Sequence, residues 1–219
     1  MTSIILAAGP AAGRIIQSDA CVTEGADWLA QHEPRFAEAL ALCGPLPLRR
    51  KPDGFGELLS AIVSQQVSVA SARAIWKRLV EAQLTTEAEI LASTEEDLRG
   101  AGLSRQKIRY SRALAQEAID FDGLRDLATL DVVKTLTKVT GVGVWTAEIY
   151  AMFSLGRADV FAPGDLALQE AARVLFDLEK RPTERELKLI AEDWSPWRSV
   201  AARILWAYYH VAKDREGIR

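Results

Sequence analysis

Two short segments of the chain combine residue types that can do chemistry together. Asp165 follows Pro163 and Gly164 and precedes an apolar run, so its carboxylate can stabilise a positive charge on a bound molecule. About twenty residues earlier, Gly141 and Gly143 form a G-V-G turn between two apolar stretches. Such glycines permit a backbone that a side chain would hinder, and they leave amides of the next helix free to meet a phosphate. The spacing indicates an anion site and a lone carboxylate in one segment.

Each of these segments also has a purely structural explanation. A G-x-G turn is commonly a helix junction where two backbones approach closely, and Asp165 is a suitable N-cap for a helix over residues 166–175. The two roles of Asp165 are compatible, because a capping carboxylate stays ionised at neutral pH, which is the state that an electrostatic stabiliser needs. On these residues alone, the structural and the chemical explanation of each segment stay open.

The elements that must position these groups are predicted to be helices. Apolar residues recur three and four apart along almost the whole chain, and no run alternates over the length of a strand, which predicts an all-α protein. One stripe consists of Phe55, Leu58, Leu59, Ile62 and Val63. After a polar turn at Gln65 and Gln66, a second stripe consists of Ala70, Ala74, Ile75 and Leu79, with Ser68 as its N-cap. Two antiparallel helices joined by a short turn follow.

Further helix starts are indicated where a hydroxyl precedes a carboxylate by three residues, because the two can satisfy free amides reciprocally. The pairs are Thr86 with Glu89, Ser93 with Glu96, and Thr183 with Glu186. A longer helix is expected over residues 104–119 after a tight hinge, and the proline-rich residues 44–54 are expected to cross between two lobes.

The composition suits a compact globular protein, with 49% hydrophobic and 26% charged residues among 219. The formal net charge of −3 gives none of the overall basicity typical of a nucleic-acid-binding protein, so a nucleic-acid partner would need local positive charge. The candidates are Arg49, Arg50 and Lys51 in one segment and Arg105, Lys107, Arg109 and Arg112 in another. A solvated helix face or linker explains either cluster equally well.

The cysteine count and the N-terminal sequence favour a cytoplasmic setting. Only Cys21 and Cys43 occur, residues 1–6 have no basic start typical of a signal peptide, and no apolar run approaches the roughly 20 residues that cross a bilayer. A reducing compartment without membrane contact is expected.

The segment LTKVTGVGVWTA followed by DVFAPGDLAL resembles the helix-hairpin-helix and Gly/Pro-rich-loop-Asp signature of the HhH-GPD DNA glycosylase superfamily. The similarity extends to GFGELLSAIVSQQVSVA, GLSRQK and PWRSVAARILW, covers about residues 50–210, and is strongest to the 3-methyladenine DNA glycosylase II branch. It implies a two-lobed helical bundle with the active-site cleft between the lobes. It also implies a bacterial, nucleoid-acting, monomeric hydrolase of class EC 3.2.2.21, which removes alkylated purines of the 3-methyladenine and 7-methylguanine type from damaged duplex DNA.

The resemblance implies roles for several residues around the base. Asp165 matches the catalytic aspartate, and Trp145 and Trp206 match aromatic residues around the flipped base, although core packing is an alternative for either tryptophan. Ile149 stands where the Escherichia-type enzyme has a pocket tyrosine. Trp145 also occupies the position of the lysine that forms a Schiff base in strand-cutting relatives, so no β-lyase activity is expected.

The resemblance also places the DNA contacts. Gln66, next to Gln65, matches the wedge that fills the gap left by the flipped base, although a polar interhelical turn is the alternative. A backbone phosphate is expected to bind amides of the hairpin, at Gly141, Gly143, Val144, Trp145 and Thr146. The backbone carbonyls of Thr137, Val139 and Val142 match a monovalent cation site for Na⁺ or K⁺.

No cofactor is expected to be required. The iron-sulfur cluster of other branches needs four cysteines near the C-terminus, and none follows Cys43. By the same resemblance, residues 1–50 are expected to pack on the C-terminal lobe, residues 51–130 to form the lobe with the wedge turn, and residues 131–219 to carry the hairpin and Asp165. The alternatives are a non-catalytic helix-hairpin-helix DNA-binding protein and a glycosylase for other damaged or mismatched bases.

Overall fold

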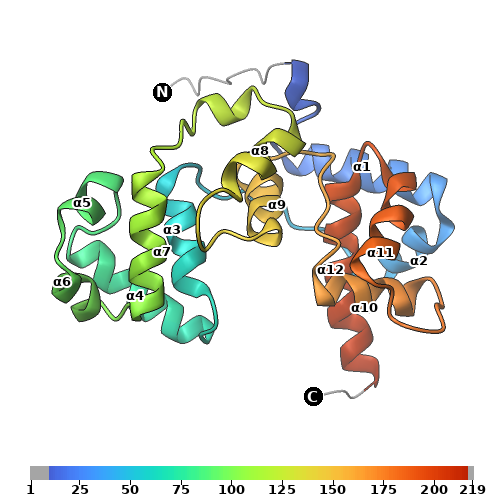
Figure 1. Ribbon diagram of the computed structural model, residues 1–219. Helices are drawn as coiled ribbons and strands as arrows, with labels where there is room; N and C mark the ends of the chain where they lie inside the picture. Colours follow the sequence, from blue (N-terminus) through green and yellow to red (C-terminus); the bar gives the residue numbers. More distant parts are fainter. Residues whose placement is uncertain (1–9, 217–219) are drawn as a thin grey trace.

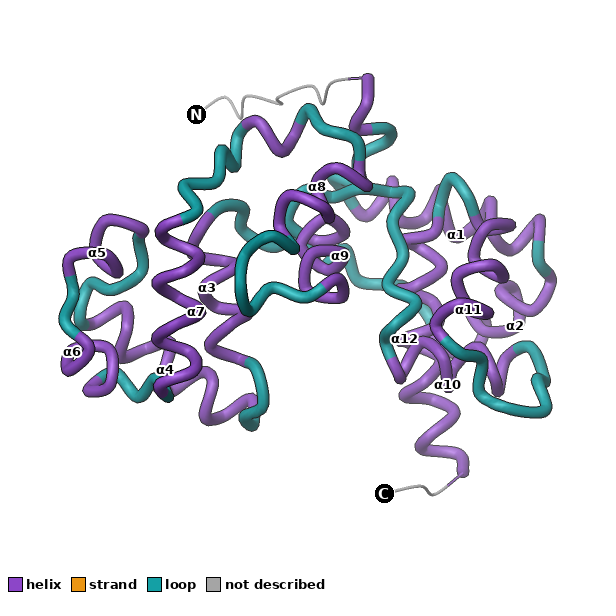
Figure 2. The backbone as a smooth tube through the Cα atoms, viewed as in Figure 1, coloured by secondary structure: helices purple, strands orange, loops and turns teal. Residues whose placement is uncertain are grey.

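The computed structural model describes residues 10–216 and, over that range, contains helices and no strand (Figure 2). This confirms the predicted all-α class. The helices are α1 (Asp19–His32), α2 (Pro34–Cys43), α3 (Phe55–Ser64), α4 (Val69–Glu81), α5 (Glu87–Ala92), α6 (Glu95–Gly100), α7 (Arg105–Gln116), α8 (Thr129–Leu136), α9 (Val144–Phe153), α10 (Leu166–Leu175), α11 (Glu184–Ile190) and α12 (Arg198–Glu216). Short 3-10 helices are η1 (Pro10–Ala12), η2 (Gly123–Arg125) and η3 (Ala191–Trp194).

The helices form two groups, with α8 and α9 between them (Figure 1). Helices α3 to α7 make one group, in which α7 packs on α3 and α5; in the other, α12 packs on α10, α2 and α1. Helices from both ends of the described chain therefore lie together. Residues 44–54 cross from α2 to α3, and Lys51 N–H donates to the Phe153 carbonyl at 3.1 Å along the way.

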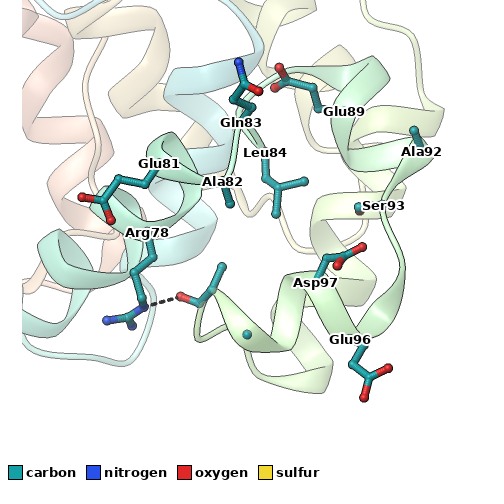
Figure 3. Close-up of a pocket in the computed structure, with 12 residues that line it drawn as sticks. Arg78, Glu81, Ala82, Gln83, Leu84, Glu89, Ala92, Ser93, Glu96 and Asp97 are labelled. Atoms are coloured by element: carbon teal, nitrogen blue, oxygen red, sulfur yellow. Dashed lines mark hydrogen bonds between the residues drawn. The ribbon is translucent and has the colours of Figure 1, made fainter.

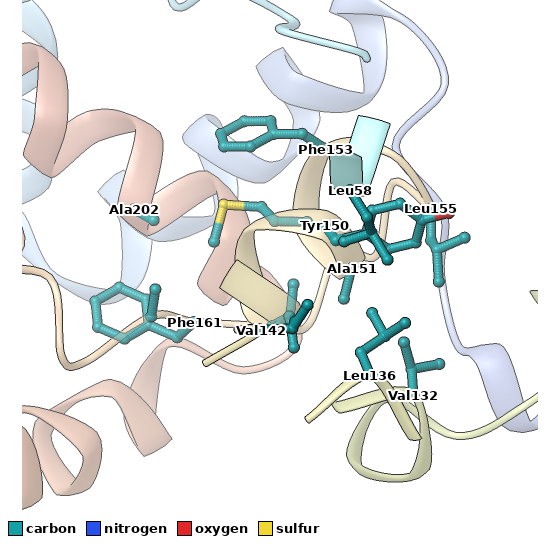
Figure 4. Close-up of a cluster of buried hydrophobic side chains, with 14 of the residues drawn as sticks. Leu58, Val132, Leu136, Val142, Tyr150, Ala151, Phe153, Leu155, Phe161 and Ala202 are labelled. Atoms are coloured by element: carbon teal, nitrogen blue, oxygen red, sulfur yellow. The ribbon is translucent and has the colours of Figure 1, made fainter. Parts of the chain in front are cut away.

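Helix α9 joins the two groups. It packs on α3 and α8, and its Phe153 ring lies 5.8 Å from that of Trp206 on α12. The buried side chains of α9 belong to one continuous hydrophobic cluster (Figure 4). This cluster also contains Leu58 from α3, Leu136 from α8 and Ala202 from α12. The expected boundaries after residues 50 and 130 stay a prediction, and α9 contacts both α3 and α12.

The buried face of α4 differs from the predicted stripe. Ala70 and Ala74 are exposed, whereas Ala72, Ile75 and Leu79 are buried. The steps of three and four along these three residues define a single helix face, and small alanines on the other faces do not mark the core. The predicted N-cap is confirmed, since Ser68 Oγ accepts from Ser71 N–H at 3.1 Å.

Two of the three predicted capping boxes are confirmed, at Thr86 with Glu89 and at Thr183 with Glu186. The pair of Ser93 and Glu96 is wrong by one residue. Helix α6 instead begins after Thr94, whose Oγ accepts from Asp97 N–H at 3.1 Å while the Asp97 carboxylate accepts from Thr94 N–H at 2.9 Å.

Helix α7 ends at Gln116 rather than at the predicted residue 119. The chain turns at Ala118, whose positive φ of 48° cannot continue a right-handed helix.

Between residues 10 and 216, no helix combines the length and the apolar character needed to cross a membrane. Cys21 and Cys43 are free thiols. The expectation about residues 1–6 lies outside the described residues.

Candidate active site

Asp165 caps α10 and receives four N–H donors. Its Oδ1 accepts from the backbone amides of Ala167 at 2.9 Å and Leu168 at 3.1 Å. The Trp145 indole donates to Oδ2 at 2.9 Å, and the Trp206 indole donates to Oδ1 at 3.4 Å. These donors and the positive end of the helix dipole stabilise a negative charge on this side chain. Both explanations of Asp165 from the sequence are thus compatible with one geometry.

The loop leading to Asp165 is held by polar side chains that the sequence motifs did not single out. Gln169 is buried and donates from Nε2 to the Pro163 carbonyl at 2.8 Å. At the start of the loop, Arg198 makes a bidentate pair with Asp159, at 2.5 and 2.9 Å. A rigid loop of this kind limits the positions open to the carboxylate. The segment PWRSVAAR contains Arg198, but the sequence offers no local signal for its distant partner.

A cavity of about 210 Å³ lies between α3 and α9. Trp145, Ile149 and Thr146 line it from α9, and Glu57, paired with Lys51 at 2.6 Å, lines it from α3. Since liquid water occupies about 30 Å³ per molecule, the space is about that of seven water molecules. The Trp145 ring is 48% exposed and bonds Asp165, so the cavity and the carboxylate share a wall.

Trp206 is placed differently from Trp145. It is half-buried, packs against Phe153 and bonds Asp165, but it does not line this cavity. The structure therefore brings Trp145 and Ile149 together in one wall and sets Trp206 on another side of the carboxylate.

The hairpin glycines have different roles in the backbone. Gly141 has a φ of +100°, and a Cβ there would lie 2.3 Å from Cγ of Tyr110 on α7. Gly143 is the N-cap of α9 with a φ of −86°, and a Cβ there would meet nothing within 4 Å. The first glycine serves the close packing of the hairpin on α7, and the second has open space at its Cβ position, at the N-terminus of α9.

The first turn of α9 presents amides that have no partner within the helix. Val144, half exposed, begins this turn. The Thr146 side chain is buried and lines the cavity, and the predicted phosphate contact of its backbone amide stays a prediction. The second half of α9 is buried on most sides, at Tyr150, Ala151, Met152 and Phe153.

The Gln65–Gln66 turn is tied to the hairpin. Gln65 Nε2 donates to the Gly141 carbonyl at 2.9 Å. Gln66 is exposed and has a φ of 55°, an uncommon conformation for a residue other than glycine. The turn thus holds Gln66 outward beside the hairpin, and its role as a wedge stays a prediction.

The cation site at Thr137, Val139 and Val142 stays a prediction. All three carbonyls belong to one turn, and neutral oxygens suit a hard monovalent ion. The Val139 carbonyl accepts from Val142 N–H at 3.0 Å and keeps its second lone pair. Three neutral backbone carbonyl oxygens are ligands of the kind that Na⁺ or K⁺ prefers. Among residues 10–216, His, Cys, Asp and Glu side chains form no cluster suited to a metal.

A larger cavity of about 770 Å³ lies between α4, α5 and α6 (Figure 3). None of the predicted site residues lines it. Its carboxylates include Glu89 and Asp97, which are engaged in capping boxes, and Arg78 donates to the Ala101 carbonyl at 2.8 Å. Helix packing accounts for these groups.

Next to the Asp165 loop, Glu148 on α9 has an unusual pKa. Burial and, to a smaller extent, the charge of Glu184 raise this pKa from 4.5 to about 7, against the opposing effect of Lys188. Glu184 also packs beside Gly164, where a Cβ would lie 3.5 Å from its Oε2. The carboxyl groups of Glu148 on α9 and Glu184 on α11 therefore interact electrostatically next to the loop.

The Glu148→Gln variant should be more stable than wild type at pH 8, by about 1–2 kcal/mol, and equally stable near pH 4. The unfolded carboxyl ionises near 4.5 but the folded one near 7, so wild type loses stability as pH rises between these values. Thermal denaturation at both pH values measures this. Glu38→Gln, on the exposed face of α2, is the control. A gain that does not depend on pH would contradict the assignment.

Known proteins resemble the chain in sequence and structure. The profile of the HhH-GPD superfamily of base excision DNA repair proteins matches residues 59–196. DNA-3-methyladenine glycosylase 1 of Schizosaccharomyces pombe is 30% identical over 178 residues, which cover 77% of this chain and 78% of the relative.

Two solved structures extend this likeness to the fold. DNA-3-methyladenine glycosidase from Bacillus halodurans matches with a TM-score of 0.79 and 31% identity over 92% of this chain and 94% of the other. The S. pombe 3-methyladenine DNA glycosylase Mag1, in complex with abasic DNA, matches with a TM-score of 0.70 and 29% identity over 84% of this chain and 95% of the other. The matched residues 59–196 include both the hairpin and Asp165. The chain therefore belongs to the HhH-GPD superfamily of base excision DNA repair proteins, as its motifs predicted.

Proposed function

We propose that the protein is a monofunctional DNA glycosylase that hydrolyses the N-glycosidic bond of alkylated purines in duplex DNA. The observation that carries this proposal is the Asp165 carboxylate, fixed by two indoles and the α10 amides on the segment that follows the hairpin. The substrate class rests on the relatives, since the S. pombe and Bacillus halodurans proteins are named for 3-methyladenine.

The arrangement suits a reaction that builds positive charge on the sugar. Cleavage of the glycosidic bond gives the deoxyribose oxocarbenium character, and the fixed negative charge of Asp165 stabilises it and can orient the attacking water. Alkylation at N3 or N7 makes the base a cationic leaving group, so a strong general acid is less necessary. The exposed face of Trp145 attracts such a cationic base.

The hairpin and the polar turn position the DNA for this step. The α9 amides behind Gly143 hold a backbone phosphate, and Gln66 beside them fills the gap that the flipped base leaves. Because Gln65 bonds the Gly141 carbonyl, the phosphate site and the wedge keep a fixed separation.

Hydrolysis without strand cleavage follows from Trp145. Its indole nitrogen donates to Asp165 and carries no basic lone pair, so it cannot form a Schiff base with the abasic sugar.

A panel of lesion duplexes tests the proposed function. Purified protein in EDTA should release free 3-methyladenine and 7-methylguanine, leave the strand intact until alkali is added, and give no borohydride-trapped adduct. Hypoxanthine, ethenoadenine, 8-oxoguanine and mismatched duplexes complete the panel. Release of only oxidised or mismatched bases would support a different glycosylase, and tight binding without any release would support a non-catalytic DNA-binding protein.

A further inference from the structure

Among the cations of α7, only some can reach DNA. Lys107 is buried, and its Nζ donates to the Val63 carbonyl at 2.6 Å. Arg112 donates to the Ser93 carbonyl at 3.1 Å. Arg105 and Arg109 remain, and both are exposed. Neither forms an ion pair with any carboxylate between residues 10 and 216.

These two arginines lie on one face of α7, because residues four apart are neighbours on a helix, about 6 Å between Cβ atoms. Together with Thr140 and the half-buried Arg112 they line an open groove of about 490 Å³. Thr140 directly precedes Gly141, so the groove starts at the hairpin. Two exposed guanidinium groups with no carboxylate partner between residues 10 and 216 therefore lie next to the phosphate site of a chain whose net charge is −3.

The position of α7 relative to the hairpin is fixed by Tyr110. Its ring packs against Gly141, and Gln106 Nε2 donates to its hydroxyl at 2.7 Å. The Arg109 guanidinium lies 5.4 Å from the centre of the same ring. A duplex anchored at the hairpin thus meets the arginine face in a constant register.

We propose that Arg105 and Arg109 bind backbone phosphates of the duplex, in addition to the phosphate held by the hairpin. The proposal rests on the proposed function insofar as DNA is the partner. Planar guanidinium groups match phosphate oxygens in geometry and charge. Glu95, at the start of α6, also lines the groove and its negative charge repels phosphate, so the strand contacts the α7 rim rather than the Glu95 side. The arginine face supplies part of the positive charge that the whole chain lacks.

Binding to undamaged duplex at a series of KCl concentrations tests the proposal, by fluorescence anisotropy with the full chain. In the Arg105→Gln/Arg109→Gln variant, the slope of log Kd against log salt should fall by about 1.8, since each phosphate contact contributes about 0.9. Arg105→Gln alone should lower the slope by about 0.9. The single variant guards against a local effect of losing the contact between Arg109 and Tyr110.

The matched control is Lys180→Gln/Arg181→Gln, which removes two exposed charges beyond the opposite end of α10 from Asp165. Its slope should equal that of wild type. An unchanged slope in the α7 variants, or an equal loss in the control, overturns the proposal. Because the readout is binding to undamaged DNA, it does not depend on base release, and a failure of the proposed function would be seen separately in the lesion panel.

Discussion

The Asp165→Asn variant is expected to bind lesion-containing duplex as wild type does but to release 3-methyladenine at least about 100-fold more slowly. The amide removes the negative charge that the developing sugar cation needs. Its oxygen can still accept from Ala167 and Leu168, so α10 stays capped and the melting temperature stays near that of wild type. Only the hydrogen bond from the Trp145 indole to Oδ2 is lost, because the amide nitrogen cannot accept it. Single-turnover release with enzyme in excess measures the chemical step alone.

The control for this variant is Asp131→Asn on α8, a half-exposed carboxylate that contacts Lys134. It loses the same charge in the helix next to the hairpin, and its release rate should match wild type. If Asp165→Asn binds DNA and releases base as fast as the control, Asp165 is only a helix cap.

The second large effect is expected at the hairpin. Gly141→Ala should destabilise the protein by about 2 kcal/mol or more, because a side chain at a φ of +100° is strained and its Cβ meets the Tyr110 ring. DNA binding should weaken more than tenfold, since α7 and the hairpin must separate. Urea denaturation and duplex binding measure the two effects.

Gly143→Ala separates packing from phosphate binding. Its backbone is ordinary and its Cβ meets nothing, so stability should change by less than about 0.5 kcal/mol. Because the proposed phosphate lies at this end of α9, the added methyl group should nevertheless weaken DNA binding. Wild-type affinity in both glycine variants would show that the hairpin does not hold DNA.

Local features of the site could be predicted because their causes are local. The helix over residues 166–175 coincides with α10, since Asp165 and the apolar periodicity behind it define both ends. The cap at Ser68 and the box at Thr183 follow from the same short-range hydrogen bonds.

Contacts between distant residues could not be predicted in this way. Periodicity cannot show that Trp145 and Trp206 both bond Asp165, because 20 and 41 residues separate the partners. Charge alone also groups Lys107 with its exposed neighbours, although its side chain is buried and donates to the Val63 carbonyl at the end of α3.

Buried cations illustrate the same limit. Arg203 on α12 is buried, donates to the Leu48 carbonyl at 3.1 Å and lies 4.8 Å from the Phe153 ring. Burial, with the nearby charges of Arg49 and Arg50, lowers its pKa to about 10. An arginine in an apolar run gives no sign of such partners until the chain is folded.

The most direct measurement compares two abasic-site analogues in duplex DNA, a neutral tetrahydrofuran and a cationic pyrrolidine that mimics the charged sugar. Wild type should bind the pyrrolidine duplex at least about tenfold more tightly, and Asp165→Asn should lose this preference while keeping its affinity for tetrahydrofuran. An undiminished preference in the variant would mean that the carboxylate does not face the sugar.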